Sequence, residues 1–148
     1  MRGGRRGPED GTVSEHRYQG QPGVGPKVTG TALVAADDFS ARYDLDRVNG
    51  VFCRPAHKLC GQSYVGRILV LNTAKGGVTT AWMLHEMQSR HMAPLALLLN
   101  AANPIMAQGA AFAGLSLMNR FDVDITRVIK TGDRVTVDPA GGLVVVRR

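Results

Sequence analysis

The sequence predicts an α/β fold in which a mixed sheet, or a barrel-like β layer, packs against two main helices. Two apolar segments, residues 65–71 and 93–100, show almost no alternation, which is typical of central strands that are buried on both faces. A helix-like segment follows each of them. The C-terminal residues 134–146 alternate between apolar and polar side chains around a glycine-rich turn, as a β-hairpin does. Strands and helices that alternate in mid-chain, between strand-rich ends, indicate an α/β architecture.

The size and composition of the chain indicate one domain preceded by a tail. A length of 148 residues fits a single core, and an aromatic fraction of only 5% means that this core must be aliphatic. Residues 1–27 are rich in Gly, Arg, Pro and Gln and contain almost no aliphatic side chains. Such a segment cannot bury enough apolar surface to become ordered, so we expect a disordered basic tail there and a folded domain over residues 28–148.

The first third of the predicted domain contains short strands. Residues 28–36 alternate loosely and suit a strand, and residues 39–46 suggest a short polar strand with a turn. Residues 48–52 predict a second brief strand that is interrupted by the turn dipeptide Asn49-Gly50. Residues 55–61 are expected to form a loop.

Two helices are expected after the buried strands. In the first, over residues 78–90, Met83, Leu84 and Met87 share one face and should pack in the core. Val78 and Trp82 lie nearly opposite, and they either join the core or contact another chain. The second helix begins at Asn103-Pro104 and ends near Gly114, with proline in the first turn, where its missing N–H costs nothing. Beyond it we expect a strand over residues 121–123 and a turn or strand over residues 126–129.

Charge and hydropathy exclude two classes of partner. The net charge of +6 is spread along the chain, without the basic stripe and interleaved aromatics of a nucleic-acid reader, so we expect no nucleic acid. Residues 92–119 contain no charged side chain, but proline and amide residues divide them into two pieces, so we expect a buried strand and helix and no membrane. The N-terminus lacks an apolar secretory region. We therefore expect a cytoplasmic protein whose two cysteines are reduced thiols.

The turn between the first buried strand and the first helix is the strongest candidate for a chemical site. It reads Thr73-Ala74-Lys75-Gly76-Gly77, and the hydroxyl residues Thr79 and Thr80 follow it. A helix N-terminus offers unpaired N–H groups and a partial positive charge, and the glycines allow a ligand to approach the backbone. The pattern differs from a Walker loop, which needs a further glycine upstream and Ser or Thr directly after the lysine. The turn is either an anion pocket or only a tight strand-to-helix connection.

Other chemistry-bearing residues have simpler interpretations. Cys53, His57 and Cys60 are three possible metal ligands, but a structural zinc site needs four and no fourth Cys or His lies close by in sequence. We therefore favour two buried thiols beside a hydrogen-bonded histidine over a metal site. The acidic pairs Asp37-Asp38 and Asp44-x-Asp46 are expected to be solvated turn residues. His85 and Glu86 are expected on the exposed flanks of the first helix.

Taken together, the ordered motifs make the chain resemble the small subunit, or swivelling domain, of aconitase X-type dehydratases. The resemblance covers about residues 28–146. The matching pieces, in order, are Gly30-Thr31-Ala32-Leu33, Asp44-Leu45-Asp46 with Asn49-Gly50-Val51, His57-Lys58-Leu59-Cys60-Gly61, Gly66-Arg67-Ile68-Leu69-Val70, the glycine turn, Leu84-His85-Glu86-Met87, Ala93-Pro94-Leu95-Ala96-Leu97, Ile129-Lys130-Thr131-Gly132-Asp133 and Val135-Thr136-Val137-Asp138.

The resemblance implies a swivelling β/β/α domain that is inactive alone and closes over the substrate of a larger subunit. It implies a hydro-lyase that removes water from a small hydroxylated carboxylate, such as a hydroxyproline or a phosphorylated mevalonate. The metal or Fe-S cluster is then expected on the large catalytic subunit, and no cofactor is expected on this chain. Lys75, Gly76 and Gly77 would bind the substrate, with supporting roles at most for His57 and Arg67.

One position departs from the family pattern. Family members often have a catalytic serine directly after the glycine of this turn, where the present chain has Gly77 followed by Val78. Thr79 or Thr80 could replace it as the base, the partner chain could supply the base, or this copy could be inactive. The alternative function is a non-catalytic anion-binding or regulatory module on the same fold.

Overall fold

The computed structural model describes residues 14–38, 44–74, 78–102 and 104–147, and for residues 78–81 it describes the backbone alone. The elements, in chain order, are β1 (Glu15–Gln19), β2 (Val28–Val34), β3 (Leu45–Asp46), β4 (Val51–Phe52), β5 (Ile68–Thr73), α1 (Val78–Ser89), β6 (Ala96–Ala101), α2 (Pro104–Ala113), β7 (Ser116–Asn119), α3 (Ile125–Val128), β8 (Arg134–Asp138) and β9 (Leu143–Arg147).

The main sheet is mixed, as the sequence predicts. Its strand order is β1-β9-β8-β2-β5-β6-β7, and β3 pairs with β4 in a separate small sheet. Strands β2, β5, β6 and β7 are parallel, whereas β8 runs antiparallel to both β2 and β9, and β1 runs antiparallel to β9. The helices α1 and α2 supply the crossovers from β5 to β6 and from β6 to β7, whereas β3 and β4 lie in the connection from β2 to β5.

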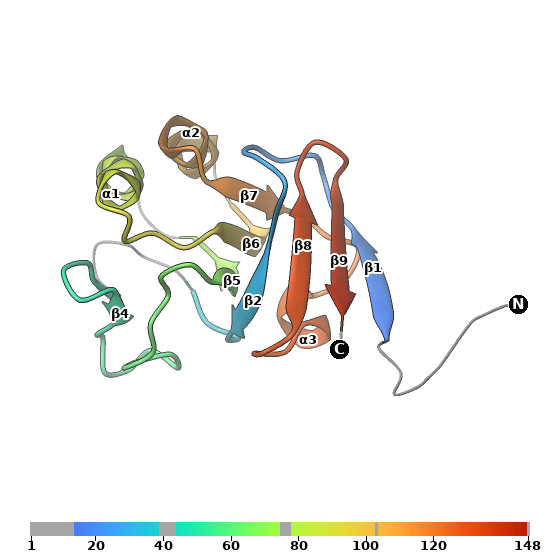
Figure 1. Ribbon diagram of the computed structural model, residues 1–148, viewed down its shortest axis with the longest axis horizontal. Coiled ribbons are helices and arrows are strands. Elements are labelled where there is room, and N and C mark those ends of the chain that lie inside the picture. Colours follow the sequence, from blue (N-terminus) through green and yellow to red (C-terminus); the bar gives the residue numbers. More distant parts are fainter. Residues whose placement is uncertain (1–13, 39–43, 75–77, 103, 148) are drawn as a thin grey trace, which may run out of the picture.

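The sheet lies between two separate hydrophobic cores, because strand β5 is buried on both faces. Leu69 and Leu71 belong to a core shared with α1 and α2, through side chains such as Leu84 and Met106. Ile68 and its face-mate Val70 belong to a second core shared with α3 and the antiparallel strands. Figure 1 shows α1 and α2 lying together on one side of the molecule, away from β8, β9 and β1. The β/β/α arrangement is therefore confirmed, and the absence of alternation in this strand has its physical cause in two separate cores.

The N-terminal segment corrects one prediction. We expected order to begin near Val28, but β1 pairs along its length with β9. Farther on, Val24 and Leu117 of β7 exchange backbone hydrogen bonds of 3.0 and 2.9 Å. This segment thus supplies one outer strand of the sheet, β1, and also pairs with the other outer strand, β7, which gives the β layer its barrel-like closure. The prediction was wrong here because backbone pairing, and not aliphatic burial, orders these residues. Residues 1–13 of the expected tail lie outside the described part of the chain.

The remaining differences are local. Residues 121–123 are not a strand, because β7 lies earlier at Ser116–Asn119. Residues 125–128 form the short helix α3, whose start is capped by the carboxylate of Asp124 accepting from the Thr126 N–H. Trp82 is 59% exposed and lies outside the core, whereas Leu84 and Met87 are fully buried as expected. Among the described residues, every helix is too short or too polar to cross a membrane.

Candidate functional site

The start of the predicted turn, Thr73 and Ala74, lies at the carboxyl edge of the parallel strands. Thr73 is the last residue of β5, and α1 begins at Val78. Lys75, Gly76 and Gly77 lie outside the described residues. Thr79 and Thr80 fall in the first turn of α1, and their side chains also lie outside the described part. In parallel sheets, ligands bind in the crevice at this edge, where the loops after successive strands meet.

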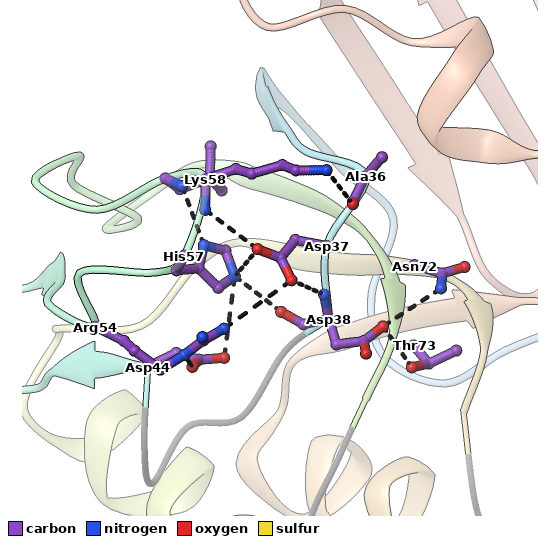
Figure 2. Close-up of polar contacts among 10 residues, drawn as sticks. Ala36, Asp37, Asp38, Asp44, Arg54, His57, Lys58, Asn72 and Thr73 are labelled. Carbon is purple, nitrogen blue, oxygen red and sulfur yellow. Dashed lines mark hydrogen bonds and ion pairs between the residues drawn. The ribbon is translucent and has the colours of Figure 1, made fainter.

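A network of polar side chains follows this edge from strand to strand. The carboxylate of Asp38, just after β2, accepts hydrogen bonds from the Thr73 hydroxyl (2.7 Å) and from Asn72 Nδ2 (3.3 Å) at the end of β5 (Figure 2). Asn72 Oδ1 accepts from Asn100 Nδ2 of β6 at 3.1 Å, and the same Nδ2 donates to Asp124 Oδ1 at 2.8 Å. The network therefore joins the residue before the predicted turn to the ends of three other elements.

His57 lies behind this edge, with a side chain that is completely buried. Its Nε2 lies 2.8 Å from the Asp38 carbonyl oxygen, and its Nδ1 accepts from the Leu59 N–H at 3.0 Å. Because Nδ1 must be an acceptor and a carbonyl can only accept, the ring is the neutral tautomer with its proton on Nε2. The ring also stacks on Phe52, with 4.6 Å between the ring centroids. His57 thus fixes the backbone at Asp38.

Charged groups surround the histidine. Arg54 Nε donates to Asp44 Oδ1, and Arg54 Nη2 lies 4.0 Å from Asp37 Oδ1. The His57 Nε2 lies 3.9 Å from one oxygen each of Asp37 and Asp44. Asp44 is only 3% exposed, so the expectation of a solvated turn residue was wrong at this position. Its long-range partner Arg54 makes the burial possible. Asp46 does behave as a turn residue, since its carboxylate accepts from the Val48 and Asn49 N–H groups.

The electrostatic state of Asp37 follows from its contacts. Partial burial raises the pKa of this carboxyl. Hydrogen bonds from the backbone N–H groups of Asp38 (2.8 Å) and Lys58 (3.1 Å), together with the positive charge of the nearby Arg54, lower the pKa by more, so the net shift is downward. Asp37 is therefore ionised at neutral pH.

The loop that carries these groups acts as a clamp on the residues after β2. Besides the His57 contact, Lys58 Nζ donates to the Ala36 carbonyl at 2.9 Å (Figure 2). Residues 36–38 are thus held from one side by this loop and tied on the other side to Thr73. Arg67 plays no part, because it precedes β5 at the opposite end of the strand, where its Nη2 donates to the Ala32 carbonyl at 3.1 Å.

The three-ligand interpretation of Cys53, His57 and Cys60 is not supported. Both ring nitrogens of His57 bond to backbone groups, and both thiols are exposed. Over the described ranges, no group of three or more His, Cys, Asp or Glu side chains is arranged to hold a metal ion.

An exposed aromatic patch was predicted only in part from the sequence, which left Trp82 either in the core or in contact with another chain and did not single out Phe112. We define it by Trp82 and His85 of α1 and Phe112 of α2. The Phe112 ring stacks on His85 at 4.6 Å and meets Trp82 edge-on at 5.6 Å. Trp82 and Phe112 are 59% and 63% exposed. The uncharged sequence of α2 was the available signal, because charged residues are depleted in the centres of protein interfaces.

Comparison with known proteins decides the family. The model of the aconitase X swivel domain matches residues 17–146. The chain belongs to the aconitase X swivel-domain family. A curated relative from Methanothrix thermoacetophila, named phosphomevalonate dehydratase small subunit, is 34% identical over 131 residues, which cover 88% of this chain and 91% of the relative. Another of that name, from Methanocella arvoryzae, is 31% identical over 120 residues, covering 81% of this chain and 91% of the relative.

The fold gives the same result. The crystal structure of Thermococcus kodakaraensis aconitase X in its holo-form matches with a TM-score of 0.81 at 27% identity, covering 88% of this chain and 98% of that chain. Family, relatives and fold together identify this aconitase X swivel domain as a dehydratase small subunit, the hydro-lyase class that the sequence resemblance implies.

Proposed function

We propose that this chain combines with a large subunit into a hetero-oligomeric, cytoplasmic dehydratase that acts on a small hydroxylated carboxylate. A phosphorylated mevalonate is the first substrate to test, because the relatives are named phosphomevalonate dehydratase. The observation that supports the site best is the bonded edge of Asp38, Thr73 and Asn72, which holds the start of the turn that we expect to bind the substrate.

The chemistry divides between the two chains. Loss of water beside a carboxylate needs a base for the carbon-bound proton and an electrophile for the leaving hydroxyl. The metal or Fe-S cluster that we assign to the large subunit would supply the electrophile. On this chain, Lys75, Gly76 and Gly77 bind the substrate's carboxylate or phosphate at the start of α1, where N–H groups and a partial positive charge favour an anion. Thr79 and Thr80 are the candidates for the base, since Gly77 occupies the usual serine position.

The direct test is an activity assay of the assembled enzyme. The full chain is co-expressed with the large subunit from a neighbouring reading frame and assayed with a phosphorylated mevalonate and with a hydroxyproline. We expect turnover by the complex and none by either chain alone. Lys75→Ala should lower kcat/KM about 100-fold through loss of anion binding. Lys27→Ala serves as the matched control, because Lys27 directly precedes β2 and lies beside residues of β1, β8 and β9. Anion binding without turnover in the complex would instead favour a non-catalytic module.

The aromatic patch supports the partner assignment. Trp82 and Phe112 are large and exposed, and Glu86 is the single Asp, Glu, Lys or Arg residue of the two helices that carry them, as suits anchor residues at interfaces. Both belong to helices whose N-termini lie at the proposed substrate edge, so a subunit that covers the site could also cover the patch. The double variant Trp82→Ala/Phe112→Ala should weaken binding to the large subunit at least about tenfold in a titration of the purified chains. Val48→Ala, which removes another exposed apolar side chain from the turn between β3 and β4, should have no such effect.

A further inference from the structure

Cys53 and Cys60 remain unexplained by the dehydratase site. Both are free, exposed thiols, and they lie at the two ends of the loop that carries Arg54, His57 and Lys58. With only two cysteines in the chain, any disulfide within one molecule must join this pair. The question is whether the fold brings the two residues close enough.

Backbone hydrogen bonds answer that question. Val51 and Ser63 form an antiparallel bridge, and next to it the Phe52 N–H donates to the Gln62 carbonyl at 3.0 Å. The Gly61 N–H donates to the Phe52 carbonyl at 2.7 Å. This last bond joins the peptide group between residues 52 and 53 to the peptide group between residues 60 and 61. The α-carbons of Cys53 and Cys60 therefore flank the same hydrogen bond.

That position suits a disulfide. Residues that face each other across an antiparallel pair have α-carbons roughly 4.5–5.5 Å apart. Disulfides span α-carbon distances of about 4.4–6.8 Å. Phe52 is buried, so the side chain of the next residue, Cys53, points to the opposite and exposed face. Gly61 adopts a φ of 88°, which brings the chain back toward β4.

We propose that Cys53 and Cys60 form a reversible disulfide that closes the loop bearing His57. The oxidant is a small-molecule disulfide such as oxidised glutathione. One cysteine thiolate attacks a sulfur of the oxidant, forms a mixed disulfide and releases one glutathione thiolate. The second cysteine thiolate then attacks the protein sulfur of that mixed disulfide and releases the other glutathione. The two protein sulfurs lose two electrons in total, and one oxidised glutathione is reduced to two thiols.

The test uses the full chain in glutathione buffers of graded redox ratio, quenched with an alkylating reagent and analysed by mass spectrometry. We expect a species that carries neither alkyl group nor glutathione, has a mass two units below that of the unmodified reduced chain, and is converted back to two thiols by dithiothreitol. Cys53→Ser and Cys60→Ser should each accumulate one glutathione adduct on the remaining thiol. Two adducts, two free thiols or a disulfide-linked dimer as the main wild-type product would overturn the proposal.

A second measurement isolates the contribution of the fold. The same titration in urea reports the tendency of the unfolded chain to close this short loop. If the native hydrogen bonds hold the cysteines together, the equilibrium constant for the disulfide should be at least about tenfold larger in the folded chain. Equal constants in the two conditions would show that the fold does not position the pair, and would contradict the proposal.

Discussion

The N-terminal segment at residues 15–25 and the loop at residues 53–60 differ in how they become ordered. Both contain few aliphatic side chains, so neither carries a pattern that predicts structure. The N-terminal segment is held by its backbone, through pairing with β9 and β7 and a hydrogen bond of 2.9 Å from the Gly20 N–H to the Gly142 carbonyl. Backbone hydrogen bonds join the two ends of the loop, but side chains, namely a buried histidine and an ion pair, hold it against the residues after β2.

This difference determines which substitutions matter in each region. A segment fixed by its backbone tolerates changes of polar side chains but not the addition of atoms where two backbones meet. A loop fixed by side chains tolerates small additions at its backbone but not the loss of the side chains that hold it. Four substitutions or conditions test this contrast, and we give them in order of decreasing effect.

Gly23→Ala should have the largest effect. A Cβ at this position would lie 1.9 Å from the Leu117 carbonyl oxygen, so β7 and the N-terminal segment would have to separate and lose the bonds between Val24 and Leu117. We expect a loss of about 4 kcal/mol in the free energy of unfolding, measured by urea denaturation. Gly141→Ala is the matched control, because its added Cβ would meet only the movable carboxylate of Asp138. Equal stability of the two variants would mean that this segment does not need close backbone approach.

His57→Ala should come next. The change removes a fully buried ring, its stacking on Phe52 and its hydrogen bonds to Asp38 and Leu59. We expect a loss of about 3 kcal/mol in the free energy of unfolding, again from urea denaturation. His16→Ala, which alters an exposed side chain of β1, should change the stability little. If His16→Ala cost as much, the contrast between the two regions would fail.

Acid should weaken the side-chain contacts at the substrate edge. The pKa of Asp124 is lowered by hydrogen bonds from Thr126 and Asn100, and that of Asp37 is also lowered. Because the folded state binds these protons less readily than the unfolded state, the stabilisation is complete above the ordinary aspartate pKa of about 4 and is lost as the pH falls through the lower folded values. Thermal unfolding between pH 7 and pH 2 should show Tm decreasing below about pH 4. Asp124→Asn should lower Tm at neutral pH and make this decrease shallower.

Glu15→Gln should have the smallest effect. Hydrogen bonds from Arg147 and Arg17 lower the pKa of Glu15, but all three side chains are solvent-exposed. Exposed ion pairs contribute little, so we expect no resolvable change in Tm at neutral pH and little dependence on salt concentration. A clear decrease in Tm would show that side chains also hold β1 in place.

The elements that the sequence predicts well are those whose pattern is local. The apolar runs at residues 65–71 and 93–100 are strands β5 and β6, and the alternating valines at the C-terminus are the hairpin of β8 and β9. Strand β1 was missed because its residues, Glu-His-Arg-Tyr-Gln, are polar and mostly exposed. Helix α3 was missed because it has only four residues, too few for a helical period.

The candidate site also has one part that the sequence predicts and one part that only the structure reveals. The position of the glycine turn, directly after a buried strand, follows from the sequence alone. The network around it does not, because Asp38 bonds to Thr73 across 35 positions of chain and to His57 across 19 positions. Contacts between residues so far apart in the sequence leave no periodic pattern. Acidic residues outside the apolar segments are therefore taken for ordinary turn residues until their partners are known.

The pairing of residues 21–24 with β7 also affects solubility. An outer strand with unpaired N–H and C=O groups recruits strands from other molecules and promotes aggregation. Here Val24 already occupies those groups on Leu117, and the Gln21 N–H donates to the Asn119 carbonyl at 3.3 Å. The N-terminal segment thereby covers the hydrogen-bonding edge of β7. We expect a variant that lacks this segment to aggregate more readily than the full chain.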